Sequence, residues 1–173
     1  MDTKPATPGA LDNASGVATL LLLAEMLKDY QGKTGVEIVA INGEEHYSAA
    51  GEVDYLDRYG TELDNVAVAI NIDGMGYVKG KTVISFYGCP EAIERNAREA
   101  FGGFPGITEG EQWYAGDHSA FVQHGRPAIA LTSDHTAELT SRIIHTPRDT
   151  PDLVDCGKLV ETAAALKRLI AGV

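Results

Sequence analysis

The sequence predicts an α/β fold built on a mainly parallel central sheet, and three observations point to it. Strand-like apolar segments alternate with amphipathic helical patterns along the 173 residues, which is the arrangement of α/β domains. The segment 65–73, NVAVAINID, is almost continuously Val, Ile and Ala, as expected for a strand covered on both faces. Acidic residues follow this segment and the earlier strand-like segment 36–41, and ligands gather at the carboxyl ends of strands in such sheets. The length favours one domain over residues 1–173.

The first half of the chain is predicted to contain two helices and two strands. Residues 1–11 are rich in Pro and Gly and are expected to form a loop. A helix is expected to begin just after Asp12-Asn13 and to run to about residue 30, because its apolar positions are spaced by three or four residues. These positions are Val17, Leu20, Leu21, Ala24 and Leu27. A buried strand over 36–41, a helix over 47–58 and the strand over 65–73 follow.

The second half continues the alternation of strands and helices. A strand over 82–87 and a helix over 91–101 are expected, followed by an irregular, Gly-rich stretch over 102–116. A short helix near His118 precedes another buried strand over 128–132. The last helix covers 150–171, with Pro151 near its first turn, where proline is tolerated.

Composition restricts the partners and the compartment of the protein. The net charge of −11 argues against nucleic acid or an anionic membrane as a partner and is compatible with cation binding. No apolar run approaches the roughly 20 residues of a transmembrane helix, so no membrane partner is expected. Cys89 and Cys156 form no CxxC pair, and no cysteine zinc site is proposed. The acidic composition and the absence of a visible signal peptide favour the cytoplasm.

Four segments place metal-binding residue types at the boundaries of predicted elements. They contribute Asp12, the pair Glu44–Glu45, Asp73 and His145. Carboxylates and imidazole together suit zinc, and also cobalt or manganese. Each segment alone has an ordinary alternative: a helix cap, a solvated acidic loop, a turn acid before glycine and a partly exposed histidine, respectively.

The motifs acquire a specific meaning when they are taken in order. They are DNASG at 12–16, GEE at 43–45, NID at 71–73, Asp117-His118 with Phe121, and HTPRDT at 145–150. Together they closely resemble the zinc aminopeptidases of peptidase family M28 over nearly the whole chain. The resemblance implies a three-layer α/β/α fold of the zinc-exopeptidase (phosphorylase/hydrolase-like) type. It also implies a metallo-aminopeptidase that hydrolyses amino-terminal peptide bonds with zinc-activated water.

Residue by residue, the resemblance implies a two-zinc site. Asp12 matches the carboxylate that bridges the two ions, Glu45 and His145 complete one zinc, and Asp73 binds the other. Glu44 matches the general base, which takes a proton from the attacking water and returns it to the leaving amine. Tyr114, His118 and Phe121 are candidates to line a substrate pocket, although packing of the aromatic rings in the core explains them equally well.

One family feature is missing from this sequence. The first zinc ligand of the family is the histidine of an HxD motif. Asp2 matches the aspartate that orients this histidine, and the histidine itself would precede Met1. The chain therefore resembles an amino-terminally truncated domain that lacks the leading strands. We accordingly expect about one zinc instead of two, weak or no activity, and an exposed sheet edge that favours a homo-oligomer. Some family members also place a tyrosine where Ile144 stands.

Two alternatives remain open from the sequence. Glutaminyl cyclases share the fold and bind one zinc through Asp, Glu and His, which is the composition of Asp12, Glu45 and His145. A single-zinc transferase of this kind is the first alternative. The second is a non-catalytic remnant or binding module that keeps the fold without the chemistry.

Overall fold

The computed structural model describes residues 3–46 and 48–172, and its centre is a four-stranded sheet. The strands are β1 (Ala69–Ile72), β2 (Thr82–Tyr87), β3 (Ile107–Glu109) and β4 (Ala128–Ser133), in the spatial order β1-β4-β2-β3. β1 runs parallel to β4 and β2 parallel to β3, whereas β2 and β4 are antiparallel. The predicted α/β class and central sheet are confirmed, and two of the three strand pairings are parallel.

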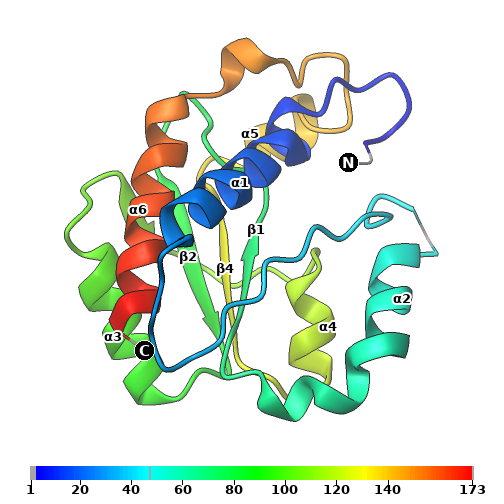
Figure 1. Cartoon of the computed structure of the whole chain (residues 1–173). Coiled ribbons are helices and arrows are strands. Elements are labelled where there is room, and N and C mark those ends of the chain that lie inside the picture. The colour runs from blue at the N-terminus through cyan, green and yellow to red at the C-terminus, as the bar shows by residue number, and fades with distance from the viewer. Residues whose placement is uncertain (1–2, 47, 173) are drawn as a thin grey trace.

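Helices cover both faces of the sheet and form three layers (Figure 1). α1 (Ser15–Leu27), α3 (Glu91–Phe101) and α6 (Cys156–Gly172) pack together on one face. α4 (His118–Gln123) packs against β1 and β4 on the other face, and α2 (Ala50–Tyr59) lies beside α4. The alternation of side chains along β4 serves both layers: Ile129 and Leu131 join the core under α1, α3 and α6, while Ala128 and Ala130 face α4.

Short elements connect the layers. A distorted turn of helix, η1 (Ala10–Ala14), leads into α1, and the 3₁₀ turns η2 (Gly60–Asn65) and η3 (Pro151–Leu153) precede β1 and α6. The predictions for 82–87 and 91–101 match β2 and α3. The predictions omitted β3 and α5 (Thr136–Arg142). α5 begins after His135, whose φ of 62° places it in the left-handed region. The sequence has no periodic apolar pattern that predicts this helix.

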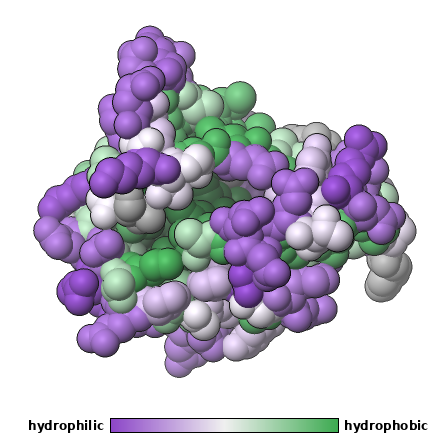
Figure 2. Space-filling view, turned by 60° about the horizontal axis from the view of Figure 1, so that its bottom comes forward, coloured by the Kyte–Doolittle hydropathy of each residue, from purple (hydrophilic) through white to green (hydrophobic). Residues whose placement is uncertain are grey.

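The strand predicted over 36–41 is wrong. No strand is assigned to this segment, and Val36 and Ile38 are each 40% exposed. The segment and β1 both line an apolar groove of about 600 Å³. Figure 2 shows a hydrophobic hollow bordered by hydrophilic side chains. A strand requires a neighbour for its backbone hydrogen bonds, and the groove keeps this segment away from the outer edge of β1.

The stretch Ala10–Leu27 is long and apolar enough, by length and composition alone, to pass as a membrane span. The core helix of a soluble protein passes the same test. In this fold α1 packs against α6, and its residues Thr19 and Leu23 are buried. Packing in the helical layer therefore accounts for the buried 33% of the stretch, whereas Leu21 is 68% exposed.

Candidate metal centre

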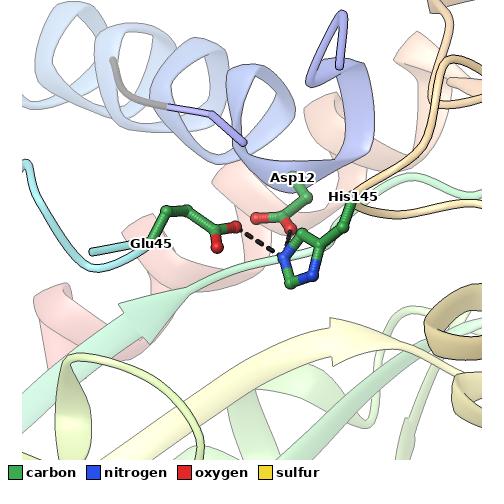
Figure 3. Close-up of side chains that lie close together, drawn as sticks. All are labelled: Asp12, Glu45 and His145. Carbon is green, nitrogen blue, oxygen red and sulfur yellow. Dashed lines mark hydrogen bonds and ion pairs between the residues drawn. The ribbon is translucent and has the colours of Figure 1, made fainter. Parts of the chain in front are cut away.

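Three side chains from distant parts of the chain meet above the carboxyl end of β1 (Figure 3). Asp12 comes from η1, Glu45 from the acidic turn at 43–46, and His145 from the loop after α5. His145 Nε2 lies 2.9 Å from Asp12 Oδ2 and 2.7 Å from Glu45 Oε1. The structure thus brings together the three residues that the sequence assigned to one zinc.

The donor set of this cluster fits a zinc ion. One ligand atom from each of Asp12, Glu45 and His145 lies within 4.8 Å of the other two. A single proton on His145 Nε2 cannot satisfy both carboxylates well, whereas a cation between the three groups would contact all of them. Two carboxylate oxygens and one imidazole nitrogen, with a fourth position left open, form the ligand set of a catalytic zinc.

Two glycines shape the turn that carries the acidic pair. Gly43 has a φ of 86°, and a Cβ on it would lie 2.9 Å from the backbone nitrogen of Ala50. A Cβ on Gly51 would lie 2.2 Å from the carbonyl oxygen of Asn42, to which the Gly51 N–H donates at 3.0 Å. The turn therefore packs closely on the start of α2. The turn buries Glu45, which belongs to the cluster, and leaves Glu44 exposed. The two adjacent carboxylates therefore have different surroundings.

Asn13 joins the start of α1 to the end of β1. Its Nδ2 donates to the carbonyl of Ile72 at 2.8 Å, and its Oδ1 accepts the N–H of Gly16 at 3.0 Å. A Cβ on Gly16 would lie 2.5 Å from the Ile72 carbonyl oxygen, so only glycine permits this approach. These contacts bring the segment of Asp12 next to Asp73, which follows Ile72. Asn13 is part of the DNASG motif, but the sequence does not predict that it joins α1 to β1.

Burial and crowding of negative charge raise the pKa values of two of the carboxyl groups. Burial, followed by the charge of Asp73 and a hydrogen bond with Glu45, raises the pKa of Asp12 to about 9. Burial, with the charges of Glu44 and Asp117, raises the pKa of Asp73 to about 7. Asp73 therefore lies within electrostatic reach of the cluster. It does not belong to the three-ligand group found among the described residues.

The pKa of Glu45 shifts in the opposite direction and is lowered. Burial alone would raise its pKa, but hydrogen bonds from Asp12 and Lys4 and the nearby His145 lower it. Lys4 Nζ lies 3.1 Å from Glu45 Oε2 and also donates to the Glu45 backbone carbonyl. This lysine could not be predicted from the sequence, because 41 residues separate it from Glu45. The cluster thus holds a proton on Asp12 and an ionised Glu45 beside an ammonium group.

The remaining predicted site residues are not members of the three-ligand group found in the described chain. His118 is 1% exposed, and its ring nitrogens lie 3.2 Å from Asn71 Nδ2 and 2.8 Å from the Trp113 carbonyl oxygen. Both nitrogens are therefore engaged, with the proton on Nε2, and burial lowers the pKa of His118. These contacts let His118 support the 113–118 loop, and the residue also lines the apolar groove. Its role toward a substrate stays a prediction. Asp2 lies outside the described residues.

The two aromatic candidates occupy different surroundings. Phe121 lines the apolar groove and contacts the ring of Tyr55 with centroids 5.9 Å apart. Tyr114 is 61% exposed and donates from its hydroxyl to Gln112 Oε1 at 2.7 Å. Neither residue belongs to the three-ligand group of the described chain, and their roles toward a substrate remain predictions.

Zinc binding at this centre should release protons and strengthen as the pH rises. Zinc needs the carboxylate form of Asp12, whose pKa of about 9 keeps it protonated at pH 7. We expect affinity to increase by up to about tenfold per pH unit between pH 6 and 8 for each proton released. Calorimetry in two buffers with different ionisation enthalpies measures the number of protons, which should be close to one at pH 7. Binding without proton release would contradict this prediction.

The raised pKa of Asp12 also makes the stability of the zinc-free chain depend on pH. The folded pKa of Asp12 lies above its ordinary value of 3.8, so the folded chain binds more protons than the unfolded chain between these values. The free energy of unfolding should therefore fall as pH rises from about 4 to 9. Zinc should offset this loss, and the thermal shift that zinc produces should be larger at pH 8 than at pH 6.

A comparison with protein families decides the membership of the chain. Residues 1–170 match the model of peptidase family M28. The chain belongs to peptidase family M28. Among curated relatives it is 27% identical over 196 residues to uncharacterized protein YfbL of Escherichia coli, covering 95% of this chain and 59% of that protein. It is 35% identical over 81 residues to a probable zinc metalloprotease of Pyrenophora tritici-repentis, covering 47% of this chain and 18% of that protein.

Solved structures show the same fold. The zinc aminopeptidase BSAP from Bacillus subtilis superposes with a TM-score of 0.83 at 24% identity, over 98% of this chain and 43% of its own. The aminopeptidase from Aneurinibacillus sp. strain AM-1 gives a TM-score of 0.82 at 24% identity, over 98% of this chain and 40% of its own. These likenesses confirm the predicted M28-type architecture. The chain spans well under two thirds of the length of these proteins.

Proposed function

We propose that the chain is the catalytic part of a zinc-dependent aminopeptidase that hydrolyses amino-terminal peptide bonds. The observation that carries the proposal is the convergence of Asp12, Glu45 and His145 within 4.8 Å, next to the exposed carboxylate of Glu44. Membership of family M28 supports the same reaction class. The substrates would be peptides or small molecules with a free amino terminus.

Metal binding and proton transfer would fall to different residues of the chain. Asp12, Glu45 and His145 would hold the zinc ion, which supplies Lewis acidity that polarises a carbonyl and lowers the pKa of water. Glu44 is not a member of the ligand group, and its exposed position allows its carboxylate to accept a proton from the attacking water. The same carboxyl group then donates the proton to the nitrogen of the leaving amine.

The charge around the centre favours a positively charged substrate end. The pKa of Asp73 is raised by the charges of Glu44, Asp117 and Glu45. These carboxylates therefore lie close enough to repel Asp73 electrostatically. An α-ammonium group placed among them would relieve this repulsion. Recognition of a free amino terminus by carboxylates is the property that distinguishes an aminopeptidase from an endopeptidase.

One tightly bound zinc per chain is expected. The described residues hold a single three-ligand group. A second ion at Asp73 would be bound by carboxylates alone, without an imidazole from the described residues. Two carboxylates alone bind a borderline-soft ion weakly. The second position should therefore fill only at high zinc concentration, and hydrolysis should be slow.

An activity assay with metal analysis tests the proposal. After exhaustive dialysis we expect about one zinc per chain by elemental analysis, in keeping with the single ligand set. The zinc-loaded chain should slowly release chromophore from leucine or alanine anilides and should lose this activity with a chelator. Hydrolysis of an amino-terminally acetylated anilide at the same rate would contradict the requirement for a free amino group.

The transferase alternative makes a different prediction in the same assay. A glutaminyl cyclase would cyclise an amino-terminal glutamine, and the family match and the aminopeptidase neighbours do not favour it. Cyclisation without anilide hydrolysis would replace the proposal with this alternative. Zinc binding with neither reaction would indicate a non-catalytic module.

A further inference from the structure

Asp149 is a fully buried carboxylate that the proposed reaction does not use. It is 0% exposed and lies four residues after His145 in the same loop. Its two oxygens accept separate backbone hydrogen bonds: Leu11 N–H donates to Oδ1 at 2.7 Å, and Asp12 N–H donates to Oδ2 at 3.1 Å. A buried carboxylate that spans two successive amides fixes the position of that backbone.

The amides held by Asp149 belong to the segment that presents a metal ligand. Asp12 has φ −116° and ψ 87°, which is not helical although it lies inside η1. Its N–H therefore depends on a partner outside the regular helix pattern, and Asp149 supplies it. A third contact, from Ala10 N–H to the backbone carbonyl of Asp149 at 3.3 Å, extends the connection.

The loop that holds Asp149 also presents His145. His145 has a φ of 60°, a region that residues other than glycine rarely adopt and that surrounding structure must maintain. Thr146 maintains it on one side, since its Oγ1 donates to the Ile143 carbonyl at 2.6 Å and its carbonyl accepts Asp149 N–H at 3.2 Å. One short loop thus carries a metal ligand and the anchor for another ligand.

We propose that Asp149 is a positioning residue for the metal centre, which clamps the Asp12 backbone to the His145 loop and so fixes the separation of these two ligands. The inference rests on the proposed metal site. The two segments are 138 residues apart in sequence, and without the clamp their relative position would have to be ordered when the metal binds. Ligands already in place lose less entropy on binding, so the clamp increases metal affinity.

Asp149→Asn tests the clamp without creating a cavity. The amide keeps the shape of the carboxylate but replaces one accepting oxygen with an NH₂ group, which faces a backbone N–H. We expect zinc affinity to fall by about tenfold to a hundredfold, the usual effect of removing a group that supports a ligand. The absorption spectrum of the cobalt-substituted chain should also change, because it reports ligand geometry.

Asp155→Asn is the matched control. Asp155 is an exposed carboxylate whose Oδ1 accepts the Gly157 N–H at 2.8 Å, and it does not belong to the three-ligand group of the described residues. It undergoes the same chemical change and should keep the zinc affinity and cobalt spectrum of the unsubstituted chain. If Asp149→Asn only lowered the melting temperature and left both properties unchanged, Asp149 would be a purely structural residue and the proposal would be overturned.

A measurement on the unsubstituted chain covers the case in which Asp149→Asn does not fold. If the clamp favours zinc, zinc must favour the clamp by the same factor. Hydrogen exchange at the Leu11 and Asp12 amides should therefore slow when zinc is added, and exchange at the Gly157 amide should change less. Equal changes at all three amides would overturn the clamp. A chain that binds no zinc would instead refute the metal centre, and the clamp with it.

Discussion

Replacing Glu44 with glutamine should reduce the turnover of leucine anilide by at least about 10²–10⁴-fold, the usual contribution of a general base. Glutamine keeps the size of the side chain but cannot accept the proton of the attacking water. The exposure of Glu44 beside the buried Glu45 separates the two roles in space. The rate is best measured at high protein concentration, where slow hydrolysis by the unsubstituted chain can be followed.

Zinc content provides the internal control for this variant. Glu44→Gln should retain the zinc of the unsubstituted chain, because Glu44 lies outside the three-ligand group. Unchanged turnover would remove Glu44 from the mechanism. Loss of zinc together with activity would make Glu44 a ligand, and the assignment of Glu44 and Glu45 would then need to be reversed.

Replacing His145 with alanine should weaken zinc binding more than any other histidine substitution in the chain. His145 supplies the imidazole of the ligand group, and its loss leaves two carboxylates for a borderline-soft ion. The decrease should exceed the roughly tenfold to hundredfold effect of removing a supporting group. Competition with a chromogenic chelator measures it directly.

Two other histidines serve as controls for His145. His46 is exposed on the acidic turn, and the Nδ1 of His124 lies 2.8 Å from the Ala120 carbonyl oxygen in α4. His46→Ala and His124→Ala should change zinc affinity little. An equal loss in His46→Ala would show that the ligands are wrongly assigned.

The sequence predicted the parts of the fold that depend on local pattern. β4 is completely buried from Ala128 to Leu131, and its continuous apolar residues indicated this burial. The segment 36–41 has an equally strand-like pattern but no strand is assigned to it. Pairing depends on a neighbouring strand edge, which the local pattern cannot reveal. The three-residue strand β3 is the opposite case, since its register with β2 defines it.

The site could be predicted where family motifs marked it. The motifs identify Asp12, Glu45 and His145, and the structure brings these residues together. The supporting contacts of Lys4 and Asp149 could not be predicted. They join residues 41 and 138 positions apart, and their geometry appears only after the layers have packed.

The most direct test of the zinc centre is the position of zinc in crystals of the loaded chain, located by anomalous scattering at the zinc edge. The principal peak should lie between Asp12, Glu45 and His145, with ligand atoms at roughly 2.0–2.2 Å. Only weak density should appear beside Asp73 at low zinc concentration. A principal peak elsewhere, for example beside His135 with Asp134 and Glu138, would contradict the assignment of this centre.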